Sequence, residues 1–126
     1  MKGVYCLTLT GLLLFSFACN NNSPKPELLA GQWQGVLMEE AGDSLAIDPS
    51  EIRFTFDQEN KGYTFNSTLN YQEAGTFYLQ TKYLFTIDTL NQASREKSVE
   101  VLKLTKDSLI LRMMNNGQEQ LLKLIR

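Results

Sequence analysis

The sequence has no histidine and only two cysteines among its 126 residues. Without histidine, the chain cannot form a Ser-His-Asp triad or a Cys-His pair, and it lacks the commonest metal ligand of proteins. Lipase, protease and metal-dependent activities therefore lack the residues that they require. We expect a protein without enzymatic activity, cofactor or bound metal.

Clustered charge of one sign is also missing. The chain has 12 Lys and Arg residues against 14 Asp and Glu residues, and its formal net charge is −2. Nucleic-acid binding needs a basic patch that neutralises phosphates, and anionic membrane surfaces attract polybasic segments. Because the chain has no such cluster, nucleic acid is excluded as a partner, and charge will not hold the protein on a membrane.

The longest apolar run is too short to span a bilayer. It extends from Cys6 to Phe17 without a charged residue, Lys2 precedes it, and Ser16 and Ala18 supply small side chains at its end. A dozen residues fall short of the roughly 20 that a transmembrane helix needs. The pattern is typical of an export signal, which we place at residues 1–18.

Cleavage after residue 18 would leave Cys19 as the only cysteine, so the mature chain could form no internal disulfide. The stretch 16–19 (SFAC) resembles the lipobox of bacterial lipoproteins, in which the Cys is acylated after cleavage. The resemblance implies a membrane anchor through a lipid on Cys19, to which each buried CH₂ contributes roughly 0.8 kcal/mol. A polar, proline-bearing tether at 19–27 would follow. The alternative is a plain signal peptide that leaves Cys19 as a free thiol.

The remaining residues, 28–126, form one domain with a strand pattern. Apolar and polar residues alternate in short runs with turn residues between them. Asn115-Asn116-Gly117 favours a tight hairpin, since Asn-Gly accepts the positive φ angles of a type I′ turn. We predict eight strands, at 31–38, 51–57, 63–71, 75–80, 82–88, 97–105, 107–114 and 118–125.

Eight sequential antiparallel strands favour an all-β fold, a small up-and-down barrel, because closure removes the exposed edges. Such a barrel has room for side chains or for one small ligand. The alternation slips at Val101-Leu102 and at Leu121-Leu122, and we expect β-bulges there. The side chains expected to point inward are Trp33, Leu37, Ile52, Phe54, Phe56, Tyr63, Phe65, Phe77, Leu79, Tyr83, Phe85, Ile87, Leu109, Leu111 and Leu122.

The segment LLAGQWQG, at 28–35, resembles the Gly-x-Trp strand that opens lipocalins. With LTKDSLILR at 104–112 and the glycine turn after it, the layout resembles the short lipocalin-like lipoproteins of Bacteroidetes over residues 28–126. The resemblance implies a small ligand-binding barrel.

Six inward residues are candidates to line a ligand site: Trp33, Phe54, Tyr63, Tyr83, Phe85 and Leu111. Trp33 has an alternative role that we favour, in which its ring plugs one end of the barrel and its N–H bonds to a backbone carbonyl. The tyrosines have an alternative role as cross-strand pairs on the sheet surface.

Two further patterns concern modification and metal binding. Ser44, Thr89 and Ser108 each follow an Asp and precede a Leu, which resembles the O-glycosylation acceptor of exported Bacteroidetes proteins. Asp and Ser also begin turns, which is the alternative. The carboxylates of the loop at 39–51 match no calcium-loop spacing, and we expect them to be solvated.

Two functional hypotheses remain. The first is a lipid-anchored lipoprotein whose barrel binds a small apolar or amphipathic molecule. The second is a structural or adaptor lipoprotein with a filled barrel that binds protein or envelope polymer, and the short domain favours it. In both we expect a monomer in the cell envelope. The outer membrane, facing the periplasm, is preferred, since Asn20 is no retention Asp and no acidic run follows Cys19.

Overall fold

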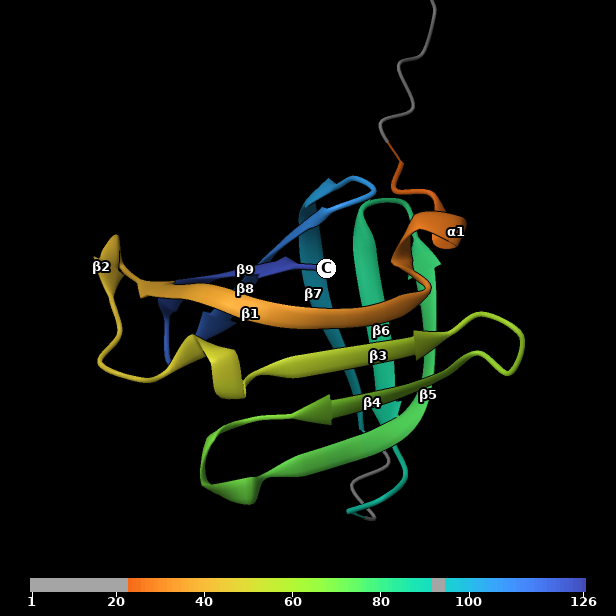
Figure 1. Cartoon of the computed structure of the whole chain (residues 1–126), viewed down its shortest axis with the longest axis horizontal. Coiled ribbons are helices and arrows are strands. Elements are labelled where there is room, and N and C mark those ends of the chain that lie inside the picture. Colours follow the sequence, from red (N-terminus) through yellow and green to blue (C-terminus); the bar gives the residue numbers. More distant parts are fainter. Residues whose placement is uncertain (1–22, 92–94) are drawn as a thin grey trace, which may run out of the picture.

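A computed structural model describes residues 23–91 and 95–126 (Figure 1). The predicted export signal and the lipidation of Cys19 lie outside these residues. Nine strands and one short helix form: α1 Pro26–Leu29, β1 Gly31–Glu40, β2 Asp43–Ser44, β3 Arg53–Asp57, β4 Gly62–Asn66, β5 Gln72–Gln80, β6 Tyr83–Asp88, β7 Glu96–Leu104, β8 Ser108–Asn115 and β9 Gln118–Ile125. Two 3₁₀ turns, η1 (Pro49–Glu51) and η2 (Thr68–Asn70), complete the set.

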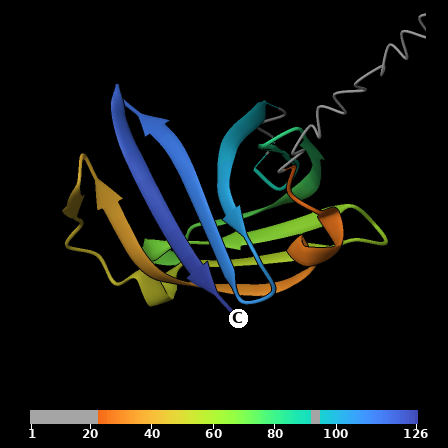
Figure 2. The ribbon, with the colours of Figure 1, turned by 90° about the horizontal axis from the view of Figure 1, so that it is seen from above.

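The strands pair antiparallel in the order β2-β1-β3-β4-β5-β6-β7-β8-β9, and β1 also pairs with β9. This last pairing closes eight strands into a barrel, to which β2 adds a short extra strand (Figures 1 and 2). The expected all-β barrel is confirmed. Closure satisfies the backbone groups that an open sheet would leave at its edges.

The predicted hairpin at the glycine turn is confirmed. Asn115 pairs with Gln118, so Asn116 and Gly117 alone make the connection from β8 to β9. Both residues have positive φ angles, 51° and 78°. A type I′ turn needs these angles, and its twist matches that of the strands on either side.

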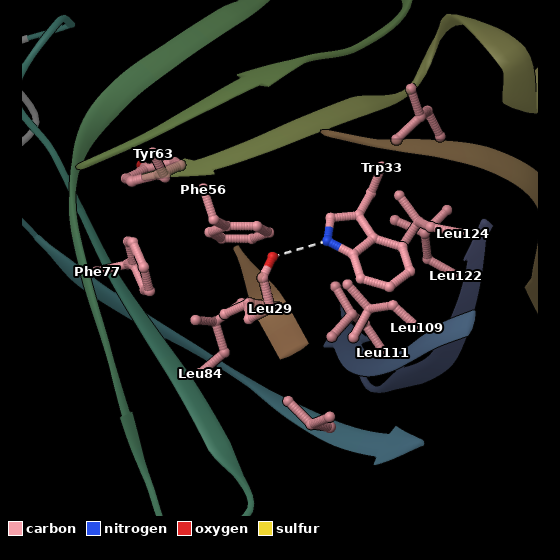
Figure 3. Close-up of a cluster of buried hydrophobic side chains, with 12 residues drawn as sticks. Leu29, Trp33, Phe56, Tyr63, Phe77, Leu84, Leu109, Leu111, Leu122 and Leu124 are labelled. Atoms are coloured by element: carbon pink, nitrogen blue, oxygen red, sulfur yellow. Dashed lines mark hydrogen bonds between the residues drawn. The ribbon is translucent and has the colours of Figure 1, made fainter. Parts of the chain in front are cut away.

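Trp33 fills one end of the barrel, as the favoured interpretation of that residue predicts. Its indole N–H donates to the carbonyl oxygen of Leu29 over 2.8 Å (Figure 3). Leu29 belongs to α1, a helix that the sequence pattern did not reveal because it has only four residues. The buried hydrophobic core comprises Leu29, Trp33, Ile52, Phe56, Tyr63, Phe77, Leu84, Val101, Leu109, Leu111, Leu122 and Leu124.

The expected inward face of β6 is wrong. Leu84 is 1% exposed and Tyr83 is 38% exposed. Tyr83, Phe85 and Ile87 lie on the outer face instead, where the rings of Phe85 and Tyr78 stack 4.8 Å apart. A shift of one residue exchanges the two faces of a strand, and β6 carries apolar residues on both. Its pairing with β5, which sets Leu84 beside Leu79, decides the face.

One of the two expected bulges is confirmed. The β7–β8 pairing shifts between Val101 and Lys103, but the β8–β9 pairing runs without a break through Leu121 and Leu122. A bulge that the sequence did not predict lies in β1, between Gly35 and Leu37. It turns Leu37 to the outer face opposite Lys123, so the inward placement of Leu37 is also wrong.

The strand predicted over 63–71 is shorter than expected. β4 ends at Asn66, and η2 follows, in which Leu69 and Asn70 both have φ angles of 59°. The positive φ angles break the extended conformation that a continuing strand requires. The helix α1 begins at Pro26, so Pro26 and Glu27 of the tether predicted over 19–27 are helical.

Candidate ligand-binding site

The two ends of the barrel differ in what covers them. At one end, α1 and Trp33 close the interior (Figure 3). At the opposite end, here called the distal end, β1, β4, β6 and β8 finish and β3, β5, β7 and β9 begin. The described residues at the distal end include the 3₁₀ turns η1, before β3, and η2, between β4 and β5, whereas α1 lies at the other end (Figures 1 and 2).

Apolar side chains line the inner wall toward the distal end. They are only partly buried and pack against the core: Met38, Phe54, Phe65, Val99 and Met113. Phe54 and Phe65 are cross-strand neighbours on β3 and β4, with ring centroids 4.6 Å apart. Partly buried aromatic and methionine side chains of this kind offer apolar contact to a ligand.

A polar cluster lies on the same wall, centred on the carboxylate of Glu73 in β5. Glu73 is 8% exposed and pairs across the strands with Phe65, which places it on the inner face. Tyr63 donates its O–H to Oε1 over 3.0 Å, and Tyr71 donates to Oε2 over 2.8 Å. Lys97 on β7 forms an ion pair with Oε2 at 3.0 Å. We call these four residues the Glu73 cluster.

The cluster keeps both phenols protonated. Burial, followed by the hydrogen bond and the charge of Glu73, raises the pKa of Tyr63 well above its usual value. The hydrogen bond to Glu73, followed by burial, raises the pKa of Tyr71 to about 12. Both hydroxyls therefore remain donors at neutral pH and satisfy a carboxylate that would be costly to bury alone.

Gln120 adds an amide to the inner wall on the other side of the barrel. It is buried and pairs with Met113, between β8 and the distal part of β1. The sequence reasoning missed Glu73, Lys97 and Gln120 as inward residues. Alternation within β5 places Glu73 on the face of Phe77, and this signal could have identified it.

Of the six predicted ligand-site residues, two belong to the candidate site, two lie in the filled core and two lie on the outer face. Trp33 and Leu111 are fully buried in the core, Tyr63 is buried within the Glu73 cluster, and Phe54 lies on the distal wall. Tyr83 and Phe85 are on the outer face and cannot line an interior site. Ser44 and Thr89 are exposed and Ser108 is half-buried, and their glycosylation stays a prediction.

Among the described residues, no three His, Cys, Asp or Glu side chains are placed to hold a metal ion. None of their helices is long and apolar enough to cross a membrane.

The chain matches no protein-family model and no curated protein. Its fold is similar to two crystal structures from Bacteroides. A lipocalin-like protein from Bacteroides uniformis aligns with a TM-score of 0.56 and 18% identity over 76% of this chain and 97% of that chain. An uncharacterized protein from Bacteroides eggerthii aligns with a TM-score of 0.51 and 14% identity over 75% of this chain and 98% of that chain. At these identities the likeness shows the fold.

Proposed function

We propose that the protein is a lipid-anchored lipoprotein of the cell envelope whose barrel binds one small amphipathic molecule at the distal end. The observation that carries the proposal is that the Glu73 cluster and five partly buried apolar side chains share the distal part of the barrel interior. Binding sites for small molecules combine a mostly apolar lining with a few fixed polar groups. The lipocalin-like fold of the structure from Bacteroides uniformis supports the same reading.

The two parts of the wall would bind different parts of the ligand. Its apolar part would contact Phe54, Phe65 and Met113, and each Å² of apolar surface that is buried contributes roughly 25 cal/mol. Its polar part would reach the Lys97 ammonium, whose side chain is 51% exposed and has donors left beyond its bond to Glu73. An amphipath fits this wall better than a hydrocarbon does.

The proposed anchor would orient the site. Cys19 precedes α1 by a short segment, and α1 caps the end of the barrel opposite the site. A lipid on Cys19 would hold that capped end near the membrane. The distal end would then face the aqueous compartment, from which it would take up or release its ligand.

One observation favours the adaptor alternative. The half of the barrel next to α1 is filled by Trp33 and by five leucines, all of them 2% exposed or less: Leu29, Leu109, Leu111, Leu122 and Leu124. A filled interior suits a protein that acts only through its outer surface. The distal wall therefore decides between the two functions.

Mass spectrometry of the native protein tests both parts of the proposal. The full chain is expressed in a Gram-negative host and extracted in mild detergent, and its mass is measured under native and denaturing conditions. We expect a denatured mass equal to residues 19–126 plus acyl chains, and an additional non-covalent mass in the native spectrum.

Matched variants locate the bound molecule. Lys97→Met should reduce its occupancy severalfold, and Lys103→Met, on the outer face of β7, should leave it unchanged. A native mass equal to that of the lipidated polypeptide would refute ligand binding and leave the adaptor function. A chain that retains residues 1–18 or carries no lipid would refute the anchor.

A further inference from the structure

A row of polar side chains crosses the outer face of four neighbouring strands. Gln34 pairs with Arg53, Arg53 with Asn66, and Asn66 with Gln72. These residues alternate with Trp33, Phe54 and Phe65, which face the interior, so the row faces outward. We call the four residues the polar row. Its strands β1, β3, β4 and β5 lie one below the other in Figure 1.

Few charged side chains surround the polar row: besides Arg53, Glu51 and Arg126 line the same part of the surface. The next outward row across the same strands is Gln32, Thr55, Thr64 and Ala74. On the other side of the barrel, β7 and β8 present Glu100, Lys103 and Arg112 on their outer face. The charged outer face of β7 and β8 is typical of a solvated sheet. The outer face around the polar row, with few charged residues, is less expected in a chain with 21% charged residues.

The polar row lies in a hollowed part of the surface. One groove of about 610 Å³ is lined by η1, the end of β4, η2 and the start of β5, and it includes Arg53, Asn66 and Gln72. A second groove of about 540 Å³ is lined in part by Gln32, Gln34, Arg53 and Asn66. The two grooves meet at Arg53 and Asn66. We call the two grooves together the track, and its lining includes all four residues of the polar row.

The only cation of the polar row is available to a ligand. In the described part of the chain, ion pairs join Lys82 and Arg112 to Glu100 and Lys97 to Glu73, and Arg53 takes part in none of them. A guanidinium presents five N–H donors in a planar fork. Arg53 can therefore donate to two neighbouring oxygen atoms of one ligand.

A fixed aromatic ring stands at one end of the track. Tyr71 lines the first groove and is 43% exposed. Its hydroxyl is bound to Glu73, and its ring meets Phe65 edge-on at 6.2 Å between centroids. Because both contacts hold the ring, it offers a surface for stacking at little cost in side-chain entropy.

The chemistry of the track selects its ligand. Amides and a guanidinium in a row recognise neighbouring hydroxyl groups, which need donors and acceptors together. The distance between adjacent strands is about 4.8 Å, close to the length of one pyranose unit in an extended glycan. We propose that the polar row and Tyr71 bind a neutral oligosaccharide laid across the strands. The polar row is on the outside of the barrel, and this site shares only Tyr71, at its end, with the Glu73 cluster of the interior site proposed above.

Titration with defined oligosaccharides tests the proposal. The lipidated protein, in a detergent without a sugar headgroup, is titrated with maltohexaose, cellohexaose and chitohexaose and followed by calorimetry and ¹H–¹⁵N NMR. We expect at least one of them to bind, with chemical-shift changes at the side-chain amides of Gln34, Asn66 and Gln72. No binding of any of the three, or binding of a sulfated hexasaccharide alone, would overturn the proposal.

Variants on the two outer faces give the control. Asn66→Ala combined with Gln72→Ala should weaken binding at least tenfold, and Arg53→Ala should weaken it further. Lys103→Ala and Glu119→Ala, which are outward positions on β7 and β9, should leave the affinity unchanged. Urea unfolding verifies that each variant is folded. An unchanged affinity in the folded double variant of Asn66 and Gln72 would overturn the proposal. Retention of the interior ligand by the same variant would show that the two ligands bind independently.

Discussion

At the scale of single residues, Trp33 shows how one side chain can close a barrel. Its ring is surrounded by leucines from β8, β9 and α1, and its N–H donates to Leu29 in a place that water does not reach (Figure 3). A buried carbonyl that loses its donor keeps the full penalty of its own desolvation. The indole therefore ties α1 to the barrel by a bond that no other apolar residue could replace.

This bond makes Trp33→Phe the sharpest test of the plug. We expect the free energy of unfolding to fall by about 2–4 kcal/mol, since the variant leaves the Leu29 carbonyl unpaired and a cavity beside it. Urea denaturation followed by circular dichroism measures the change. Gln32→Ala, at the exposed neighbouring position, should change stability by less than about 0.5 kcal/mol. Equal effects of the two substitutions would show that the bond contributes nothing.

Leu69 adopts a backbone conformation that its side chain disfavours. It is 96% exposed and has a φ of 59°, in the left-handed region that costs an L-residue roughly 1–2 kcal/mol. Leu69→Gly should raise the free energy of unfolding by up to about 1 kcal/mol, because glycine adopts this region without strain and loses part of the gain through its chain entropy. Leu69→Ala keeps the strain and should change little. Greater stabilisation by Ala than by Gly in thermal unfolding would contradict this account.

At the scale of elements, the sequence predicts which segments are strands better than which face each strand buries. Strong alternation with polar residues between, as in β3, fixes the face, and Phe54 and Phe56 point inward as expected. β6 has apolar residues on both faces, so only its pairing with β5 settles the question. The bulge in β1 begins at Gly35, where the Pro49 backbone also approaches closely, since a Cβ on Gly35 would come within 2.4 Å of the Pro49 carbonyl oxygen.

The same limit applies to the candidate site. Tyr63 and Phe54 could be placed at the interior from alternation alone, but the Glu73 cluster could not be predicted from the sequence. It combines side chains from β4, β5 and β7 that meet only once these strands have paired in the curved sheet. The polar row is likewise a property of register, since its four residues come from four strands and have no pattern in the chain.

The end of β6 carries a carboxylate whose protonation should affect stability. Asp88 is buried, which by itself would raise its pKa, but hydrogen bonds from Asn91 and from the Leu90 N–H outweigh burial and lower the pKa below its usual value. A lowered pKa in the folded state stabilises the fold above about pH 4, the pKa of an unfolded Asp, and this stability is lost as pH falls through the lower folded value.

Asp88→Asn should therefore be less sensitive to acid than the parent protein. We expect the difference in free energy of unfolding between parent and variant to shrink as pH falls from about 5 to about 2, in urea titrations at each pH. The variant should be the less stable protein at neutral pH, because the amide is a weaker acceptor for three donors. A difference that stays constant over this range would show that Asp88 keeps its ordinary pKa in the fold.

At the scale of the whole molecule, the two ends of the barrel differ in composition and packing. One end is closed by α1, Trp33 and leucines, and the proposed lipid anchor would join the chain there. The distal end carries the Glu73 cluster and partly buried apolar side chains. If the proposed ligand binds at the distal end, substitutions of Lys97 should alter ligand retention with little loss of stability, because its side chain is 51% exposed.

Arg126 links the parts of the chain that close the first of these ends. Its guanidinium lies 4.2 Å from the centre of the Trp33 ring, and it donates to the carbonyl oxygens of Leu28 and Lys106 over 2.7 Å each and to that of Ala30. It thereby joins the residue that follows β9 to α1 and to the β7–β8 turn, so that segments far apart in the sequence are held together.

Removal of this link should weaken the closed end. We expect Arg126→Ala to lower the free energy of unfolding by about 1–2 kcal/mol, from an exposed cation–π contact and partly solvated hydrogen bonds. Arg126→Lys should recover less than half of the loss, because an ammonium cannot reach three carbonyl groups with one planar fork. Lys123→Ala, an exposed position on the same strand, is the control for urea denaturation. Full recovery by lysine would show that charge alone, and not the shape of the guanidinium, holds β9 against α1.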